Sequence, residues 1–489
     1  MNQQDYLKEI DRVIAKGPFQ DTWESLSQFQ IPGWYKNAKF GIFIHWGLYS
    51  VPAYYGEWYL RNMHDSKNPT YQFHRETYGD PKDFGYKDFI PLFHGEKFNA
   101  EEWISLFREA GARFVMPVAE HHDGFQMYHS ELSQWCASKM GPKKDILGLL
   151  KTESEKQGLV FCASSHRAEH YWFANGSLTY DSGVPESPDR DDLYWPNRGK
   201  GFHSEQFQDI TVLTPEQDFL EDWLVRTCEL IDRYQPRILY FDWWIQNLAF
   251  KPYLKKLAAY YYNRAEEWGI QVAIDYKYDA FKLHTAVHDI ERGQMELIQP
   301  DFWQCDTSVA NNSWCYTVNN EYKKPQDIIC DLVDIVSKNG ALLLNIGPKA
   351  DGSIPEEDRH ILIEIGRWLA QNGEGIYGTC PFKQFGEGPT KVKGGYFSDT
   401  ERSAFTSEDF RFTYKGGFLY VFVMKRPENK TVRIQSLGRR DPIFNALAER
   451  IEVLENHRLA SFSQTEEALE VSFECEKSPY PLCLKVSFS

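Results

Sequence analysis

The sequence lacks the features that mark several large classes of protein. No apolar run reaches the roughly 18 residues that a membrane-spanning helix needs, and residues 1–5 show no basic start followed by an apolar core. The nine cysteines are an odd number without CxxC spacing, so neither a zinc ribbon nor a complete disulfide framework is indicated. We therefore expect a cytoplasmic protein without a membrane partner, whose cysteines are mostly buried thiols.

Basic residues are also fewer than acidic ones. The chain has 54 Lys and Arg against 70 Asp and Glu, which gives a net charge of -16. Such a charge repels nucleic acid, so we expect no nucleic-acid partner. No GxGxxG motif follows an apolar run that could form a strand, which leaves a dinucleotide-binding fold without support.

Aromatic side chains are abundant instead. They make up 16% of the 489 residues, with 15 Trp and 28 Tyr. Large hydrophobic cores account for such a composition, and platforms on which sugar rings stack are the alternative. A chain of this length without repeats or low-complexity tracts favours one enzyme-sized domain plus a smaller one.

Helix-like and strand-like segments alternate through most of the chain. Asn99 is a good N-cap for a helix that precedes a strand at 113–119, where Pro117 predicts irregular pairing. Thr214 and Pro215 resemble the start of a second helix, which precedes a strand at 237–241. The alternation predicts a parallel sheet, and at this length a (β/α)8-like barrel is favoured over an open doubly wound sheet.

The later units follow the same order until the pattern changes near residue 378. Helix-like segments at 254–267 and 325–336 precede strands at 270–274 and 341–346. Beyond residue 378 the apolar residues recur with period two, and a Gly416-Gly417 turn indicates a hairpin. We therefore divide the chain into a catalytic barrel at 1–378 and an antiparallel β domain at 379–489.

One carboxylate stands where a barrel enzyme places its catalytic groups. A strand of a parallel barrel is buried on both faces and reads as a continuous apolar run, and its carboxyl end opens into the active site. The run 237–241 ends in Asp242, which is followed by Trp243 and Trp244. Asp242 is therefore the best candidate for a catalytic nucleophile.

Other polar and aromatic residues follow strand ends and would converge on the same face of the barrel. These candidates for substrate binding are His45, Glu57, Trp58, His121 and His122. A metal site is the minority interpretation, because consecutive histidines on an extended backbone point to opposite sides and no HxH or HExxH spacing occurs. We expect no metal.

Retaining hydrolysis of a glycosidic bond needs a second carboxyl group, held roughly 5 to 5.5 Å from the nucleophile, to protonate the leaving oxygen. The candidates downstream of Asp242 are Asp275, Asp289, Glu291, Glu296 and Asp306. Glu291 is preferred because it is expected in a loop, where burial against aromatics such as Trp303 would raise its pKa. The alternative is a surface glutamate paired with Arg292.

Several segments together resemble the α-L-fucosidases of glycoside hydrolase family 29. The matching segments are 34–47, 56–59, 121–125, the strand that ends at Asp242, and 342–348 with Asp351 and Gly352. The resemblance implies a barrel followed by a β-sandwich, no cofactor, and retaining release of terminal α-L-fucose from a fucosylated oligosaccharide or glycoconjugate. It also implies that Asp242 is the nucleophile and that the five substrate-binding candidates contact fucose.

Three departures from the family pattern affect the site. Gln304 stands where many members have a glutamate, so Glu291 is our choice for the acid/base, with Glu296 and Asp306 behind it. The altered segment 164–172 makes His166 a candidate sugar contact, and Trp303 is expected beside the sugar as well. Where the family pattern has an Asp-Arg pair, this sequence has Asp275-Tyr276-Lys277. A catalytically weak or silent fucose-binding relative is therefore the alternative function. The sequence leaves a homo-oligomer open.

Overall fold

The computed structural model describes residues 2–198, 214–401, 403–442 and 445–489. A sheet of parallel strands has the order β1-β9-β8-β7-β6-β5-β4-β2-β3, and it closes because β1 also pairs with β2. The short β3 and β4 both pair with β2 and share one position of the barrel. The strands are β1 (Phe40–Ile44), β2 (Phe114–Glu120), β3 (Val160–Phe161), β4 (Ala163–Ser165), β5 (Ile238–Phe241), β6 (Ala273–Lys277), β7 (Val287–Glu291), β8 (Trp303–Ser308) and β9 (Gly340–Ile346). The eight-stranded barrel predicted from the sequence is confirmed.

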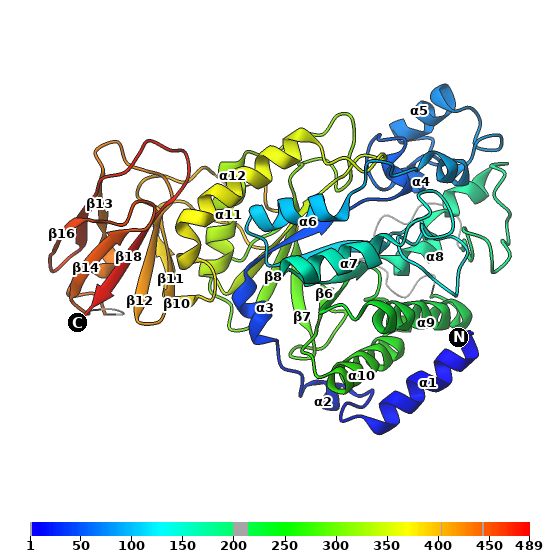
Figure 1. Cartoon of the computed structure of the whole chain (residues 1–489), viewed down its shortest axis with the longest axis horizontal. Coiled ribbons are helices and arrows are strands. Elements are labelled where there is room, and N and C mark those ends of the chain that lie inside the picture. Colours follow the sequence, from blue (N-terminus) through cyan, green and yellow to red (C-terminus); the bar gives the residue numbers. More distant parts are fainter. Residues whose placement is uncertain (1, 199–213, 402, 443–444) are drawn as a thin grey trace.

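Helices cover the outside of the barrel (Figure 1). The long ones are α1 (Gln3–Lys16), α6 (Ala100–Glu109), α7 (Ile146–Gln157), α9 (Gln217–Tyr234), α10 (Lys251–Trp268), α11 (Pro325–Ser337) and α12 (Glu356–Asn372). The short ones are α2 (Trp23–Leu26), α3 (Gly33–Ala38), α4 (Tyr59–Asn62), α5 (Pro69–Thr77) and α8 (His170–Phe173). In the fully described stretch 273–308, no α-helix separates β6, β7 and β8. Among the described residues, no helix has the length and apolar character needed to cross a bilayer.

Local signals in the sequence explain several of these boundaries. The Asn99 side chain accepts hydrogen bonds from the backbone N–H groups of Glu101 and Glu102 and begins α6, as predicted. The pairing of β2 with β4 shifts register between Val118 and Glu120, next to Pro117, which confirms the expected irregularity.

Two of the boundaries that differ from the prediction have a clear local cause. The helix expected from Thr214 begins at Gln217, because the backbone of the preceding residue, Glu216, is still extended (φ -72°, ψ 155°). The strand expected at 270–274 is β6 at 273–277, because the N–H of Ile270 donates to the carbonyl of Ala265 and closes the end of α10. The later start puts Asp275 in the middle of β6 and Lys277 at its carboxyl end.

The C-terminal part of the chain forms two antiparallel sheets at one end of the molecule (Figure 1). One sheet has the order β10-β11-β12-β18-β14-β15 and the other β13-β17-β16. Their strands are β10 (Cys380–Glu387), β11 (Phe410–Lys415), β12 (Phe418–Val423), β13 (Thr431–Ile434), β14 (Ala448–Val453), β15 (Arg458–Leu459), β16 (Ser461–Gln464), β17 (Leu469–Ser472) and β18 (Leu482–Phe488). Buried side chains of both sheets, such as Phe412 and Val471, share one core, which makes a β-sandwich.

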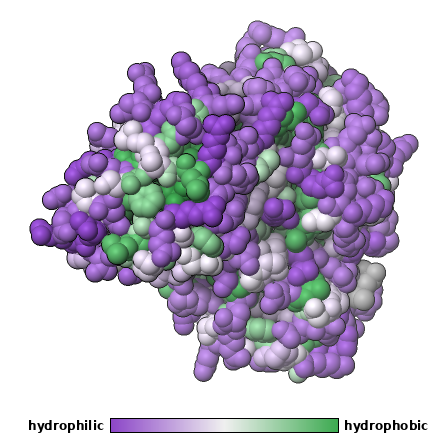
Figure 2. All heavy atoms as spheres, turned by 60° about the vertical axis from the view of Figure 1, so that its left-hand side comes forward, coloured by the Kyte–Doolittle hydropathy of each residue, from purple (hydrophilic) through white to green (hydrophobic). Residues whose placement is uncertain are grey.

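The surface and the cysteines agree with the composition. Figure 2 shows a largely hydrophilic face, with one group of hydrophobic side chains on the part that comes forward. All nine cysteines are free thiols and seven of them are buried, as predicted.

Candidate active site

Asp242 follows the last residue of β5, at the carboxyl end of the barrel. Its side chain is 14% exposed, so it is reachable from the surface. The Nδ1–H of His166 donates to Asp242 Oδ2 at 3.1 Å, and His122 Nε2 lies 3.4 Å from the same oxygen. Burial raises the pKa of Asp242, but the two imidazoles outweigh it and hold the pKa well below its usual range. Asp242 is therefore an ionised carboxylate at neutral pH.

His122 carries a positive charge between two carboxylates. Its Nδ1–H donates to the carbonyl of His166 at 2.9 Å, and its Nε2 lies 3.2 Å from Glu169 Oε2 as well as near Asp242. Burial lowers the pKa of His122, yet the charges of Glu169 and Asp242 raise it overall to about 9. A protonated imidazole thus holds the Asp242 carboxylate in place.

Glu291 is the last residue of β7 and does not lie in a loop as predicted. The indole Nε1–H of Trp243 donates to Glu291 Oε2 at 2.5 Å, and the ammonium of Lys277 lies 3.1 Å from the same oxygen. Burial raises the pKa of Glu291 to about 7, with Asp242 adding to the rise and Lys277 opposing it. The aromatic residue that contacts Glu291 is therefore Trp243 and not Trp303. Because Trp243 directly follows Asp242, Glu291 and Asp242 belong to the same site.

The other four carboxyl candidates have different positions. Asp275 accepts a hydrogen bond from the hydroxyl of Tyr35 inside the barrel, and Asp289 and Asp306 form ion pairs with Lys277 at 3.2 and 3.1 Å. Glu296 is exposed and accepts a hydrogen bond from the backbone of Gly394. Asp306 also accepts a hydrogen bond from the hydroxyl of Tyr240 within β5, whereas Glu291 contacts Trp243, the residue that follows Asp242.

Trp303 does not lie at the site, contrary to our expectation. It is the first residue of β8, whereas the site lies at the carboxyl ends of the strands. It is 2% exposed, and its indole N–H donates to the carbonyl of Lys338 at 3.0 Å. Gln304 is interior too, where it accepts from Tyr35 and donates to Asp289. The stretch aligned with the family's acid segment is therefore part of the barrel core.

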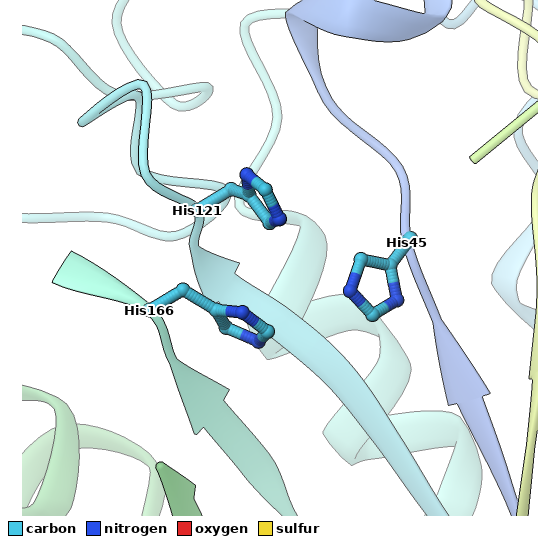
Figure 3. A group of neighbouring side chains, drawn as sticks. All are labelled: His45, His121 and His166. Carbon is cyan, nitrogen blue, oxygen red and sulfur yellow. The ribbon is translucent and has the colours of Figure 1, made fainter. Parts of the chain in front are cut away.

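Three imidazoles face one another beside Asp242. Figure 3 shows His45, His121 and His166 pointing together from the ends of neighbouring strands. The His121 ring centre lies 4.9 Å from that of His166 and 5.6 Å from that of His45. Burial lowers the pKa of all three, so they are neutral at pH 7.

Neutral imidazoles of this kind can bind hydroxyl groups or a metal ion. The Nδ1–H of His45 donates to Asn345 Oδ1 at 2.7 Å, which leaves its Nε2 as an acceptor. One ring nitrogen from each histidine lies within 4.8 Å of the others, a spacing that a zinc-like ion could bridge. That the site works without a metal stays a prediction.

Glu57 and Trp58 complete the wall of the site. Glu57 Oε2 accepts a hydrogen bond from the backbone N–H of Trp314 at 3.1 Å, and the Trp314 ring centre lies 5.2 Å from that of His45. Trp58 meets the His122 ring edge-on, with the ring centres 5.9 Å apart. The structure therefore brings together every predicted site residue except Trp303.

Three residues of the site were not singled out in the sequence. Glu169 faces His122, Asn345 orients His45, and Trp314 supports Glu57. Asn345 is the polar residue in the otherwise apolar strand 341–346, which is a readable signal. Glu169 and Trp314 come from irregular segments, whose positions the periodicity of the sequence does not predict.

A closed parallel barrel with an ionised carboxylate and a carboxyl group of raised pKa beside a cluster of buried imidazoles is an arrangement that suits a glycoside hydrolase. The family model described as alpha-L-fucosidase matches residues 7–374. The chain therefore belongs to the alpha-L-fucosidase family, as its motifs indicated.

Known proteins agree with this assignment. The chain is 28% identical to the tissue alpha-L-fucosidase of Homo sapiens over 447 residues, which are 88% of this chain and 83% of that protein. It is 31% identical to the plasma alpha-L-fucosidase of Homo sapiens over 376 residues, 74% of this chain and 72% of that one. The crystal structure of Thermotoga maritima alpha-fucosidase in complex with fucose matches with a TM-score of 0.74 and 28% identity, over 96% of this chain and all of that one.

Proposed function

We propose that the protein is a retaining, exo-acting α-L-fucosidase that releases terminal α-L-fucose from fucosylated oligosaccharides or glycoconjugates. One arrangement carries the proposal: two imidazoles lie within 3.4 Å of Asp242 and hold its pKa well below its usual range, whereas Glu291 is buried against the indole of Trp243 and its pKa is raised to about 7. Two carboxyl groups whose environments separate their pKa values in this way suit a nucleophile and an acid/base.

In the first step the Asp242 carboxylate attacks the anomeric carbon of fucose. The bond from that carbon to the glycosidic oxygen breaks, an ester forms, and Glu291 gives its proton to the leaving oxygen. In the second step the Glu291 carboxylate takes a proton from water while the water oxygen attacks the anomeric carbon. The ester bond breaks, Asp242 regains its charge, and the released fucose has the α configuration of the substrate.

The imidazole cluster and its neighbours suit the sugar. Neutral His45, His121 and His166 offer donors and acceptors to hydroxyl groups at a buried site. Trp58 gives an apolar surface beside them, which matches the side of fucose that carries the C5 methyl group. The similar Thermotoga maritima alpha-fucosidase has been crystallised in complex with fucose, which supports fucose as the sugar.

The alternative is a weak or silent fucose-binding protein. Gln304 motivated it, because glutamine cannot donate a proton as an acid. Gln304 lies in the barrel interior and Glu291 contacts Trp243, which favours an active enzyme. Hydrolysis of an aryl fucoside and of a fucosyl disaccharide separates the two functions, because a silent relative binds both and cleaves neither.

Product stereochemistry tests the mechanism. We expect NMR of an early time point with an aryl α-L-fucoside to show α-L-fucose, which later mutarotates. Initial formation of β-L-fucose would contradict a double displacement.

A further inference from the structure

A loop from the C-terminal part of the chain lies on the segment that follows Glu291. The loop is the stretch 394–399, between β10 and β11. Its backbone N–H groups at Gly395, Phe397 and Asp399 donate to the carbonyls of Gln294, Glu291 and Arg292 at 2.9, 2.9 and 2.8 Å. The C-terminal part therefore contributes directly to the surroundings of the acid/base candidate.

Phe397 stands out in this loop. Its side chain is 48% exposed, although phenylalanine is usually buried. Its backbone has φ 58°, in the left-handed region that costs a bulky residue energy. A strained and exposed aromatic side chain at a functional site suggests a role for the ring itself.

The loop also places this ring beside the catalytic groups. The Phe397 ring lies nearly parallel to that of Trp243, at 19° and 6.3 Å between centres, and Trp243 is the donor to Glu291. Tyr396 anchors the loop, because its ring packs on Trp243 at 5.1 Å and its hydroxyl contacts His288 Nε2 at 2.9 Å. Phe397 is thus held in an exposed position next to Glu291, the proposed proton donor.

We propose that Phe397 is a stacking platform for the leaving-group sugar. This inference rests on the proposed function: Glu291 must reach the glycosidic oxygen, so the sugar beyond that oxygen lies on the Glu291 side. The expected ligand is a pyranose with an apolar face of C–H groups, such as galactose or N-acetylglucosamine, which packs on an exposed aromatic ring. The platform would set the preference for the leaving group without touching fucose.

The test compares substrates with and without a leaving-group sugar. We expect Phe397→Ala to lower kcat/KM for a fucosyl-galactose or fucosyl-N-acetylglucosamine disaccharide roughly threefold to tenfold. Hydrolysis of α-L-fucosyl fluoride, whose leaving group is one atom, should be unchanged. Phe397→Asn, a residue that tolerates the left-handed backbone, should behave like the alanine variant.

Phe418→Ala is the matched control, because Phe418 is a 36% exposed aromatic residue at the start of β12 in the same C-terminal part. It should leave both activities unchanged. Equal losses on disaccharide and fluoride in both Phe397 variants, or no loss on any disaccharide, would overturn the inference. If the unchanged protein hydrolysed neither substrate, the proposed function itself would fail.

Discussion

At the scale of single residues, the two carboxyl groups of the site differ because their neighbours differ. Asp242 lies against His166 and the positively charged His122, which favour its ionised form. Glu291 is buried beside Trp243, and burial favours its neutral form more strongly than Lys277 favours the charged one. The different roles that we propose for the two carboxyl groups thus follow from neighbouring side chains that a sequence motif alone does not locate.

The rate lost when the Glu291 carboxyl group is removed should depend on the leaving group of the substrate. We expect Glu291→Ala to lower kcat for a fucosyl disaccharide by about 10²- to 10⁴-fold, because the leaving sugar needs a proton. An aryl fucoside with an activated leaving group should lose much less in its first step, and azide should restore turnover and give α-L-fucosyl azide. Steady-state rates with product analysis provide the measurement.

Glu296→Ala is the control for this variant, since Glu296 is an exposed carboxylate that contacts the Gly394 backbone away from Asp242. It should keep full activity. Equal losses of the Glu291 variant on both substrates, without rescue by azide, would exclude Glu291 as the acid/base.

The pH dependence should follow the proton of Glu291. The acid form is needed, so kcat/KM for a disaccharide should be steady below pH 7 and fall as the pH rises through about 7, the raised pKa of Glu291. Asp242 stays ionised over this range because its pKa is depressed. With fucosyl fluoride, which needs no acid, the decline above pH 7 should be absent. A decline at the same pH on both substrates would assign it to another group.

The limits of residue-level prediction are visible at Trp303 and Gln304. Trp303 was expected beside the sugar and Gln304 was aligned with the family's acid position, but both belong to the start of β8, away from the carboxyl ends of the strands. Asp242 and His45, by contrast, lie at the carboxyl ends of strands as expected, because each directly follows an apolar run whose end is clear in the sequence. Position along a strand decides whether a side chain reaches the site, and the apolar pattern gives that position only at clear strand ends.

At the scale of elements, the barrel was readable because its strands are buried on both faces. The runs 40–44 and 340–346 are buried throughout, so their composition alone marks them as central strands. β6 was placed three residues too early, because the apolar pattern does not show that Ile270 still belongs to the closing turn of α10. At Ile270, the hydrogen bond that closes the end of α10 determines the backbone conformation, although the apolar pattern is typical of a strand.

The packing of α12 on α6 predicts an unusual effect of alanine. Alanine normally stabilises a helix relative to glycine by about 0.5–1 kcal/mol. At Gly366 in α12, however, an added Cβ would lie 2.1 Å from the carbonyl oxygen of Glu109 at the end of α6. We expect Gly366→Ala to lower the free energy of unfolding by roughly 1–3 kcal/mol, measured by denaturant or thermal unfolding.

Gly33→Ala is the matched control, since a Cβ on Gly33 in α3 would meet no atom within 4 Å. It should be neutral or stabilising. If the Gly366 variant were as stable as the Gly33 variant, the two helices would not be in the close contact described.

At the scale of the whole molecule, the barrel and the C-terminal sheets are joined by buried charge. Arg411 of β11 donates to Asp334 of α11 at 2.5 Å, and Lys338 binds the same carboxylate at 2.7 Å. All three side chains are buried. The loop that carries Phe397 connects β10 to β11, the strand that carries Arg411.

Removal of one of these three buried charged side chains should lower the stability of the protein. We expect Arg411→Ala to lower the free energy of unfolding by about 3 kcal/mol or more, since it leaves buried charge with incomplete compensation. Arg433→Ala removes an exposed ion pair with Glu470 and should cost less than about 1 kcal/mol. Thermal unfolding of both variants is the measurement, and equal shifts would contradict a buried joint.

The proposed double displacement requires a covalent bond between Asp242 and fucose. We would incubate the protein with a fluorinated fucosyl inactivator that forms the ester quickly and releases it slowly, then digest it and locate the label by tandem mass spectrometry. A double displacement at Asp242 predicts one fucosyl group, on the Asp242 carboxylate. A label on another side chain would contradict it, and so would an active protein with Asp242→Ala.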